Sequence, residues 1–203
     1  MKIANDEELK KAADQTSRLL REIQIYCRET QRAIEFVPEA QVAFPRGFIH
    51  TADHHRESLR FLNNQDLKSN VAYQLMVSEA IQWLTIRTDI TGTVEEMLYK
   101  LLLAQIGTVI ESVTKNYLHG ICGKGFNARL THLVDHKVIT NELKDELAWV
   151  WEMRNRTHLF LLKETEYEND YNADSYQRAT NAFRALVNAL NEGPPSRKLE
   201  ETL

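Results

Sequence analysis

The chain has 203 residues, of which 27% are charged and 43% hydrophobic, and its formal net charge is -4 at pH 7. This composition excludes a disordered or fibrous protein, and also a nucleic-acid binder that relies on an overall positive charge. With 7 Gly and 4 Pro, the chain lacks the many turns that an all-β sandwich or barrel requires.

The cysteines and the hydrophobic runs indicate a cellular compartment. Cys27 and Cys122 are far apart and form no CxxC pattern, which argues against a disulfide scaffold and a thiolate zinc site. No apolar run approaches the ~18 residues of a membrane span, and the N-terminus has no apolar signal core. We therefore expect a cytoplasmic protein that does not associate with membranes and binds no cofactor.

Helical periodicity dominates the chain, because apolar residues recur at steps of three and four positions. Two cap patterns, Asn5 followed by Glu8 and Thr93 followed by Glu96, predict where two helices begin. We expect helices, in chain order, over residues 5–31, 51–62, 67–87, 93–118, 127–136, 140–162 and 173–191. The clearest apolar stripe lies on the helix expected over residues 93–118 and consists of Leu98, Leu102, Ile106, Val109, Val113 and Tyr117.

The order of these elements predicts the fold class. The sequence shows no strong alternating strand pattern and no internal repeat. It therefore predicts an all-α protein, an antiparallel helical bundle. We expect residues 1–90 to form an N-terminal helical region that packs on the bundle, residues 91–193 to form the helical core, and residues 194–203 to be a flexible tail.

Two polar side chains lie in line with the apolar face of the helix expected over residues 140–162. At about 100° per residue, that face continues through Arg154 and His158. Burying an unpaired guanidinium costs on the order of several kcal/mol, so the sequence predicts either a partner such as Glu111 or a functional cleft. An arginine that binds phosphate beside a histidine that transfers protons is the minimum set for cleaving RNA without a metal ion.

The same segment carries a resemblance to a known family. Residues Trp149–Leu159, with the sequence WVWEMRNRTHL, resemble the signature helix of the HEPN superfamily (higher eukaryote and prokaryote nucleotide-binding domains), in which an arginine and a small polar residue precede a histidine. The helix expected to contain Glu111 resembles the long HEPN helix that carries an acidic residue. The resemblance covers residues 93–190, and the spacing from Arg154 to His158 is shorter than the usual one of the family.

The resemblance implies a HEPN-type bundle with an N-terminal helical extension. Active HEPN proteins are metal-independent endoribonucleases of toxin–antitoxin and abortive-infection systems, and two Arg–His motifs of a homodimer face one cleft. Carried over to this chain, the motif makes Arg154, Asn155 and His158 the catalytic residues, with Glu111 in support. RNA is then the substrate and an antitoxin or another protein a partner. The alternative is a catalytically silent HEPN-type module for dimerisation or partner binding.

Small residues precede Glu111 on its helix. Ala104, Gly107 and Thr108 lie on a face away from the main apolar stripe and lead to Glu111. Because small residues allow two helices to approach closely, we expect the helix of Arg154 to pack on this face and to bring Arg154 within reach of Glu111.

Two pairs of histidines have helical spacing. His50 and His54 are four positions apart, with His55 directly after them, and His132 and His136 repeat the spacing. On a helix, such a pair can supply half of a metal site. The sequence identifies no third ligand for either pair, so we interpret these histidines as exposed polar residues and predict no metal site.

The remaining motifs argue against DNA recognition. A helix–turn–helix reading of residues 130–150 puts Glu142, Asp145 and Glu146 near the start of the recognition helix, where they repel phosphates. We therefore expect no specific DNA binding. Trp149 and Trp151 are interpreted as packing residues rather than as surfaces for stacking RNA bases.

Overall fold

The structure, a computed structural model, describes residues 2–45, 47–123, 125–157 and 170–193. Within these residues the chain is helical, without a β-strand, so the predicted all-α class is confirmed. The described elements, in chain order, are α1 (Asp6–Glu29), the 3₁₀ helix η1 (Pro38–Ala40), α2 (Ala52–Ser58), α3 (Gln65–Arg87), α4 (Thr93–Tyr117), α5 (Phe126–Asp135), α6 (Asn141–Asn155) and α7 (Ala173–Glu192).

The chain divides into two compact units, residues 1–45 and residues 46–203. The first unit contains α1 and η1. In the described helices of this unit, Cys27 is the one buried residue. The second contains α2 to α7. The boundary expected at residue 90 falls inside the second unit, between two helices that pack on each other. Hydrogen bonds of Gln105 join them: the Ser78 hydroxyl donates to its Oε1 at 3.1 Å, and its Nε2 donates to Oε1 of Gln74 at 2.7 Å and to the Gln74 carbonyl oxygen at 3.5 Å. The expected tail, 194–203, lies outside the described residues.

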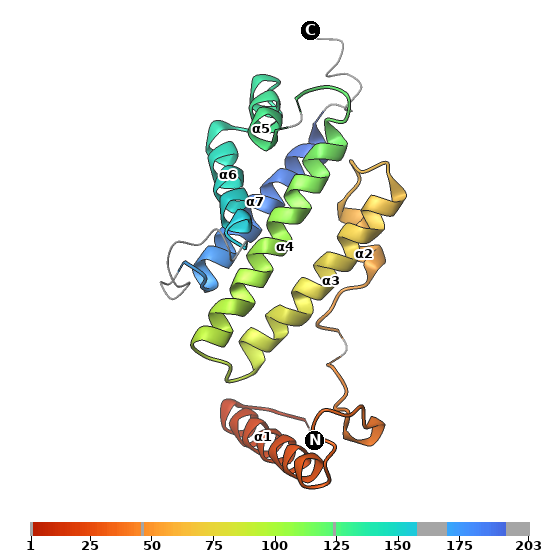
Figure 1. Ribbon diagram of the computed structural model, residues 1–203, viewed down its shortest axis with the longest axis vertical. Helices are drawn as coiled ribbons and strands as arrows, with labels where there is room; N and C mark the ends of the chain where they lie inside the picture. Colours follow the sequence, from red (N-terminus) through yellow and green to blue (C-terminus); the bar gives the residue numbers. More distant parts are fainter. Residues whose placement is uncertain (1, 46, 124, 158–169, 194–203) are drawn as a thin grey trace. The chain divides into compact units, whose positions relative to one another are not determined.

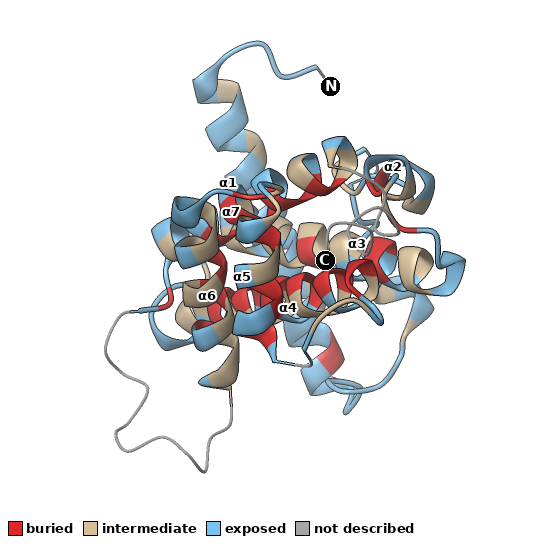
Figure 2. Cartoon of the chain, turned by 90° about the horizontal axis from the view of Figure 1, so that it is seen from above, coloured by how far each residue is buried: buried red, intermediate tan, exposed pale blue. Residues whose placement is uncertain are grey.

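Helix α4 is the centre of the second unit. It contacts α3, α5, α6 and α7, and both α3 and α6 run in the opposite direction to α4 (Figure 1). The predicted apolar stripe is confirmed, since all of its members are buried except Leu98, which is partly buried. Buried residues gather on α4 and on the faces of its neighbours (Figure 2).

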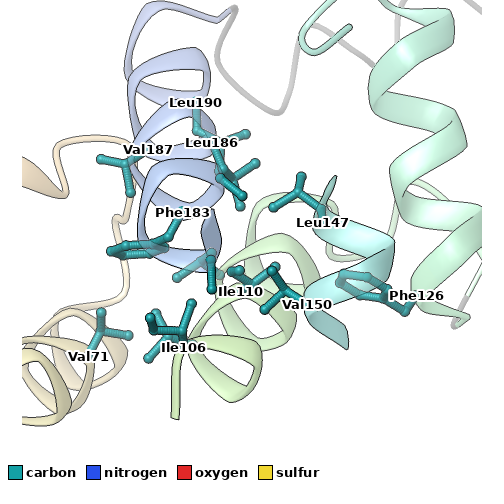
Figure 3. Packing of buried hydrophobic residues seen from close by; sticks show 14 of the residues in the cluster. Val71, Ile106, Ile110, Phe126, Leu147, Val150, Phe183, Leu186, Val187 and Leu190 are labelled. Carbon is teal, nitrogen blue, oxygen red and sulfur yellow. The ribbon is translucent and has the colours of Figure 1, made fainter. Parts of the chain in front are cut away.

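Side chains of α4, α6 and α7 meet in the core around Ile110 (Figure 3). Ile110 of α4, Leu147 and Val150 of α6 and Leu186 of α7 are fully buried. At roughly 25 cal/mol per Å² of apolar surface removed from water, burying side chains of this size is the main favourable term for the unit. The core therefore holds α6 firmly against α4, which positions the segment that carries Arg154.

The start of α4 differs from the prediction. Thr93 is the first helical residue, not the cap, and the N-cap is Gly92 with φ +65° and no side chain. A threonine that already has helical dihedrals cannot fold its hydroxyl back onto the first turn as a capping residue does, so the predicted capping box is wrong. The cap predicted at Asn5 is confirmed, since its side chain accepts the backbone N–H of Glu8 at 2.9 Å.

The end of α6 differs as well. The helix expected to continue to residue 162 ends at Asn155, and Arg156 is its C-cap. The carbonyl of Arg154 accepts both the backbone N–H of Thr157, at 3.2 Å, and the hydroxyl of the same residue, at 2.8 Å. A threonine hydroxyl that bonds a nearby carbonyl competes with helical hydrogen bonding, so the chain turns here. The expectation of a continuous helix through His158 is therefore wrong.

Candidate functional site

Helices α4 and α6 approach each other closely at Gly107. A Cβ atom built on this glycine of α4 lies 2.6 Å from Cβ of Arg154, 3.1 Å from its Cγ and 3.3 Å from the carbonyl oxygen of Val150. A side chain at this position has no space unless α6 moves away. The expected packing of the Arg154 helix on this face of α4 is confirmed at Gly107. Ala104 and Thr108 instead line a groove that faces α3.

Arg154 reaches a carboxylate one turn further along α4. Its Nη2 atom lies 3.2 Å from Oε2 of Glu111, and its Nη1 atom donates to Oδ1 of Asn155 at 3.0 Å. Gly107 and Glu111 are four positions apart and so lie on one face of α4. The expected contact between Arg154 and Glu111 is confirmed, and the structure also brings Asn155 to the guanidinium.

The ion pair of Arg154 with Glu111 is partly exposed to solvent. The side chain of Arg154 is 31% exposed and that of Glu111 is 33% exposed. An ion pair at such a position contributes only about 0.2–1 kcal/mol to stability. The pair therefore orients the guanidinium but adds little to the stability of the fold. The guanidinium also stays partly accessible to solvent.

His158 lies outside the described residues. The sequence places it on the face of Arg154 by assuming a continuous helix, and α6 ends at Asn155. The structure thus brings together three of the four residues expected at the site: Arg154, Asn155 and Glu111.

The two tryptophans of α6 pack as expected. The ring of Trp151 stacks on Phe126 of α5 with centroids 5.3 Å apart. The guanidinium of Arg178 of α7 lies 4.0 Å from the centroid of the Trp149 ring. Both rings are thereby engaged with neighbouring helices.

A second cluster of polar side chains lies where α2 meets α3. The Glu79 carboxylate has one oxygen 2.6 Å from Nδ1 of His50 and the other 3.4 Å from Nε2 of His55. The His54 ring stacks on the His50 ring with centroids 4.3 Å apart. Burial lowers the pKa of His55, and the Glu79 carboxylate opposes this shift.

Glu79 was not among the residues predicted from the sequence. His50 and His54 have the spacing of helical neighbours, but His50 precedes the N-cap Thr51, and it is His55 that shares the carboxylate with it. Glu79 is 29 positions from His50. Only the packing of α2 on α3 joins them, so the pattern of the sequence carries no signal for the third residue.

Among the described residues, no carboxylate bridges the other histidine pair in this way. His132 and His136 of α5 and its C-cap have ring centroids 4.0 Å apart, and Nδ1 of His136 lies 2.9 Å from the His132 carbonyl oxygen. Burial, followed by the charge of His136, lowers the pKa of His132, whereas Asp135 opposes the shift. Nε2 of His132 is buried and makes no hydrogen bond to any residue that the structure describes.

Comparisons of the chain with protein-family models, with curated proteins and with solved structures give no match. The resemblance to the HEPN superfamily therefore rests on the residues of the Arg154 segment and stays a prediction. Among the described helices, none combines the length and the apolar character needed to cross a lipid bilayer.

Proposed function

We propose that the protein is a metal-independent endoribonuclease of HEPN type. The contact between Arg154 and Glu111 supports this proposal most directly, because the resemblance pairs an arginine of the signature helix with an acidic residue of the long helix. The partial exposure of Arg154 leaves it accessible to a phosphate group. Asn155, which accepts a hydrogen bond from the guanidinium, orients it.

The reaction needs two groups of the chain. His158 takes the proton of a ribose 2′-OH, and the 2′ oxygen attacks phosphorus. The bond from phosphorus to the 5′ oxygen breaks, and that oxygen receives a proton, which leaves a 2′,3′-cyclic phosphate and a 5′-OH end. Arg154 binds the phosphoryl oxygens, on which negative charge builds in the transition state. Glu111 and Asn155 hold Arg154 in position.

The biological setting follows from the same proposal. A homodimer places two such sites in one cleft, and the protein acts on RNA in the cytoplasm as a toxin or defence effector. An antitoxin or another protein partner controls it.

The ion pair is compatible with phosphate binding. An exposed pair is worth about 0.2–1 kcal/mol, whereas a two-point contact between arginine and phosphate is charge-assisted on both bonds and stronger. A phosphate therefore does not have to overcome a large ion-pair free energy to bind Arg154. Glu111 acts as a positioning residue and not as a competitor that blocks the site.

The test is RNA cleavage in excess chelator, with single-stranded and structured RNA. Wild type is compared with Arg154→Ala and His158→Ala. The matched control is Arg178→Ala, because Arg178 also pairs with a glutamate of a neighbouring helix, Glu146, at 2.6 Å. Loss of the base is expected to lower the rate by about 10²–10⁴ and loss of the arginine by about 10²–10³, with the control unchanged.

Two results contradict the proposal. One is cleavage that persists in both the Arg154 and the His158 variants. The other is cleavage of RNA that carries 2′-O-methyl groups, because the methyl group removes the nucleophile. Circular dichroism spectra of each variant verify that the fold is retained.

A second candidate is a catalytically silent HEPN-type module. The observation that favours it is that Arg154 already pairs within its own chain and that α6 ends before His158. In this case Arg154 acts as a strut between α4 and α6. A dimer in light-scattering experiments, with no RNA cleavage and lower stability of Arg154→Ala, is the result expected for this alternative.

A further inference from the structure

The histidine cluster opens onto a cavity of about 410 Å³ between α2, α3 and α7. One ring nitrogen of His50, one ring nitrogen of His55 and one carboxylate oxygen of Glu79 all lie within 4.8 Å of one another. Each is an atom with a lone pair that a metal ion can accept. These residues are separate from the Arg154 site, which lies on α4 and α6.

We propose that His50, His55 and Glu79 bind one divalent transition-metal ion such as Zn²⁺. Two imidazole nitrogens and one carboxylate oxygen form a common ligand set of zinc sites that keep one position open. Tetrahedral ligands at zinc are separated by about 3.4 Å, given metal–ligand distances of about 2.0–2.1 Å. The contact of His55 with Glu79 already has this separation, at 3.4 Å. Nδ1 of His50 contacts the other oxygen of the same carboxylate, at 2.6 Å, so an ion requires the His50 ring to move away from Glu79.

A buried ring nitrogen of His55 also supports a metal ion at this position. Nε2 of His55 is buried and, within the described part of the chain, makes no hydrogen bond of acceptable geometry, although it lies 3.4 Å from the Glu79 carboxylate. Buried polar atoms in folded proteins nearly always have a partner. A metal ion between Nε2 and the carboxylate satisfies both groups.

The surroundings hold the ligands in place. The backbone N–H of His50 donates to Oε2 of Glu79 at 2.7 Å, which fixes the carboxylate. The His54 ring stacks on the His50 ring and restricts its rotation. Such supporting contacts orient ligands at metal sites. The side chains of His55 and Glu79 are 11% and 19% exposed, whereas that of His50 is 53% exposed, so the ion enters from the side of His50.

The open position faces the cavity, where Tyr176 and Arg184 of α7 also lie. A water molecule or an anionic group can occupy it. The ion also links the segment before α2 to the middle of α3. Because it binds only the folded chain, it stabilises the unit by mass action. This site does not depend on the proposed ribonuclease activity, which needs no metal.

Binding of Zn²⁺ to the full chain, first stripped with chelator and free of any histidine tag, tests the proposal by equilibrium dialysis and calorimetry. We expect one ion per chain and a rise in the unfolding temperature with Zn²⁺. Glu79→Gln and His55→Ala are each expected to weaken binding at least tenfold, on the scale at which even supporting residues affect metal sites. The control is His136→Asn, which removes a histidine of the other pair and leaves binding unchanged.

The proposal is overturned by no binding at about millimolar Zn²⁺, by equal binding in wild type and in both ligand variants, or by loss of the ion in the control. His50→Ala provides a further test if a substitution at a buried ligand prevents folding, because His50 is exposed and precedes α2. Unchanged affinity in a folded His50→Ala variant also overturns the proposal. RNA cleavage plays no part in these measurements, so the ribonuclease and metal proposals can fail separately.

Discussion

Replacing Gly107 with alanine is expected to push α6 away from α4. The new methyl carbon lies 2.6 Å from Cβ of Arg154 and 3.1 Å from its Cγ. Carbon atoms in contact prefer about 3.5–4.0 Å, so relief requires a displacement of about 1 Å. Cβ of Arg154 is fixed to the backbone of α6, which means that a change of side-chain rotamer cannot remove the closest contact.

Two effects of opposite sign determine the measured stability. Forcing an extra methyl group into a packed contact costs about 1–3 kcal/mol. Alanine inside a helix is about 1 kcal/mol more favourable than glycine. The net destabilisation in the wild-type background is therefore about 0–2 kcal/mol. In an Arg154→Gly background both side-chain contacts disappear, and of the three nearest atoms only the Val150 carbonyl oxygen remains, at 3.3 Å. There Gly107→Ala is expected to stabilise the protein by up to about 1 kcal/mol.

The coupling energy between positions 107 and 154 comes from a double-mutant cycle of wild type, the two single variants and the double variant. Each protein is unfolded in urea and followed by circular dichroism. We expect about 1–3 kcal/mol, well above the ~0.5 kcal/mol within which independent sites add. Gly123→Ala is the control, because a Cβ there meets only the Ala128 Cβ, at 3.6 Å. A coupling below about 0.5 kcal/mol, or a gain of the full helix propensity in the wild-type background, refutes the close approach of α6 to Gly107.

Two further predictions concern the charged groups. Glu111→Arg and Arg154→Glu each place like charges across the α4–α6 contact and are expected to lower the free energy of unfolding by up to about 1 kcal/mol. The double substitution restores an attractive pair and is expected to recover this loss in urea unfolding. If it recovers nothing, the two residues are not partners. Acid is expected to destabilise the protein through His132. Burial and the charge of His136 lower the pKa of this residue below its ordinary value of 6.5, although Asp135 opposes the shift. Because the unfolded chain then binds the proton more readily, the free energy of unfolding falls as the pH drops below about 6.5 until the folded pKa is passed; an unchanged pH slope in His132→Gln contradicts this account.

Local patterns were sufficient to predict most of the helices. The apolar stripe of α4 and the cap at Asn5 depend on residues within a few positions of one another. The contact at Gly107 was also predictable, because a small residue next to a future partner helix marks a close approach. The same local information failed at the end of α6, where the hydrogen bonds of Thr157 to the Arg154 carbonyl compete with the helix.

The amino-acid sequence alone determined the helical class, the positions of most helices and the pairing of Arg154 with Glu111, because helical periodicity and the small face on α4 are local properties. Which histidines meet a carboxylate depends instead on how the helices pack. Glu79 reaches His50 and His55 across the packed faces of α2 and α3. The angle and register at which two helices pack depend on the fit of many side chains at once, and no spacing within either segment contains that information.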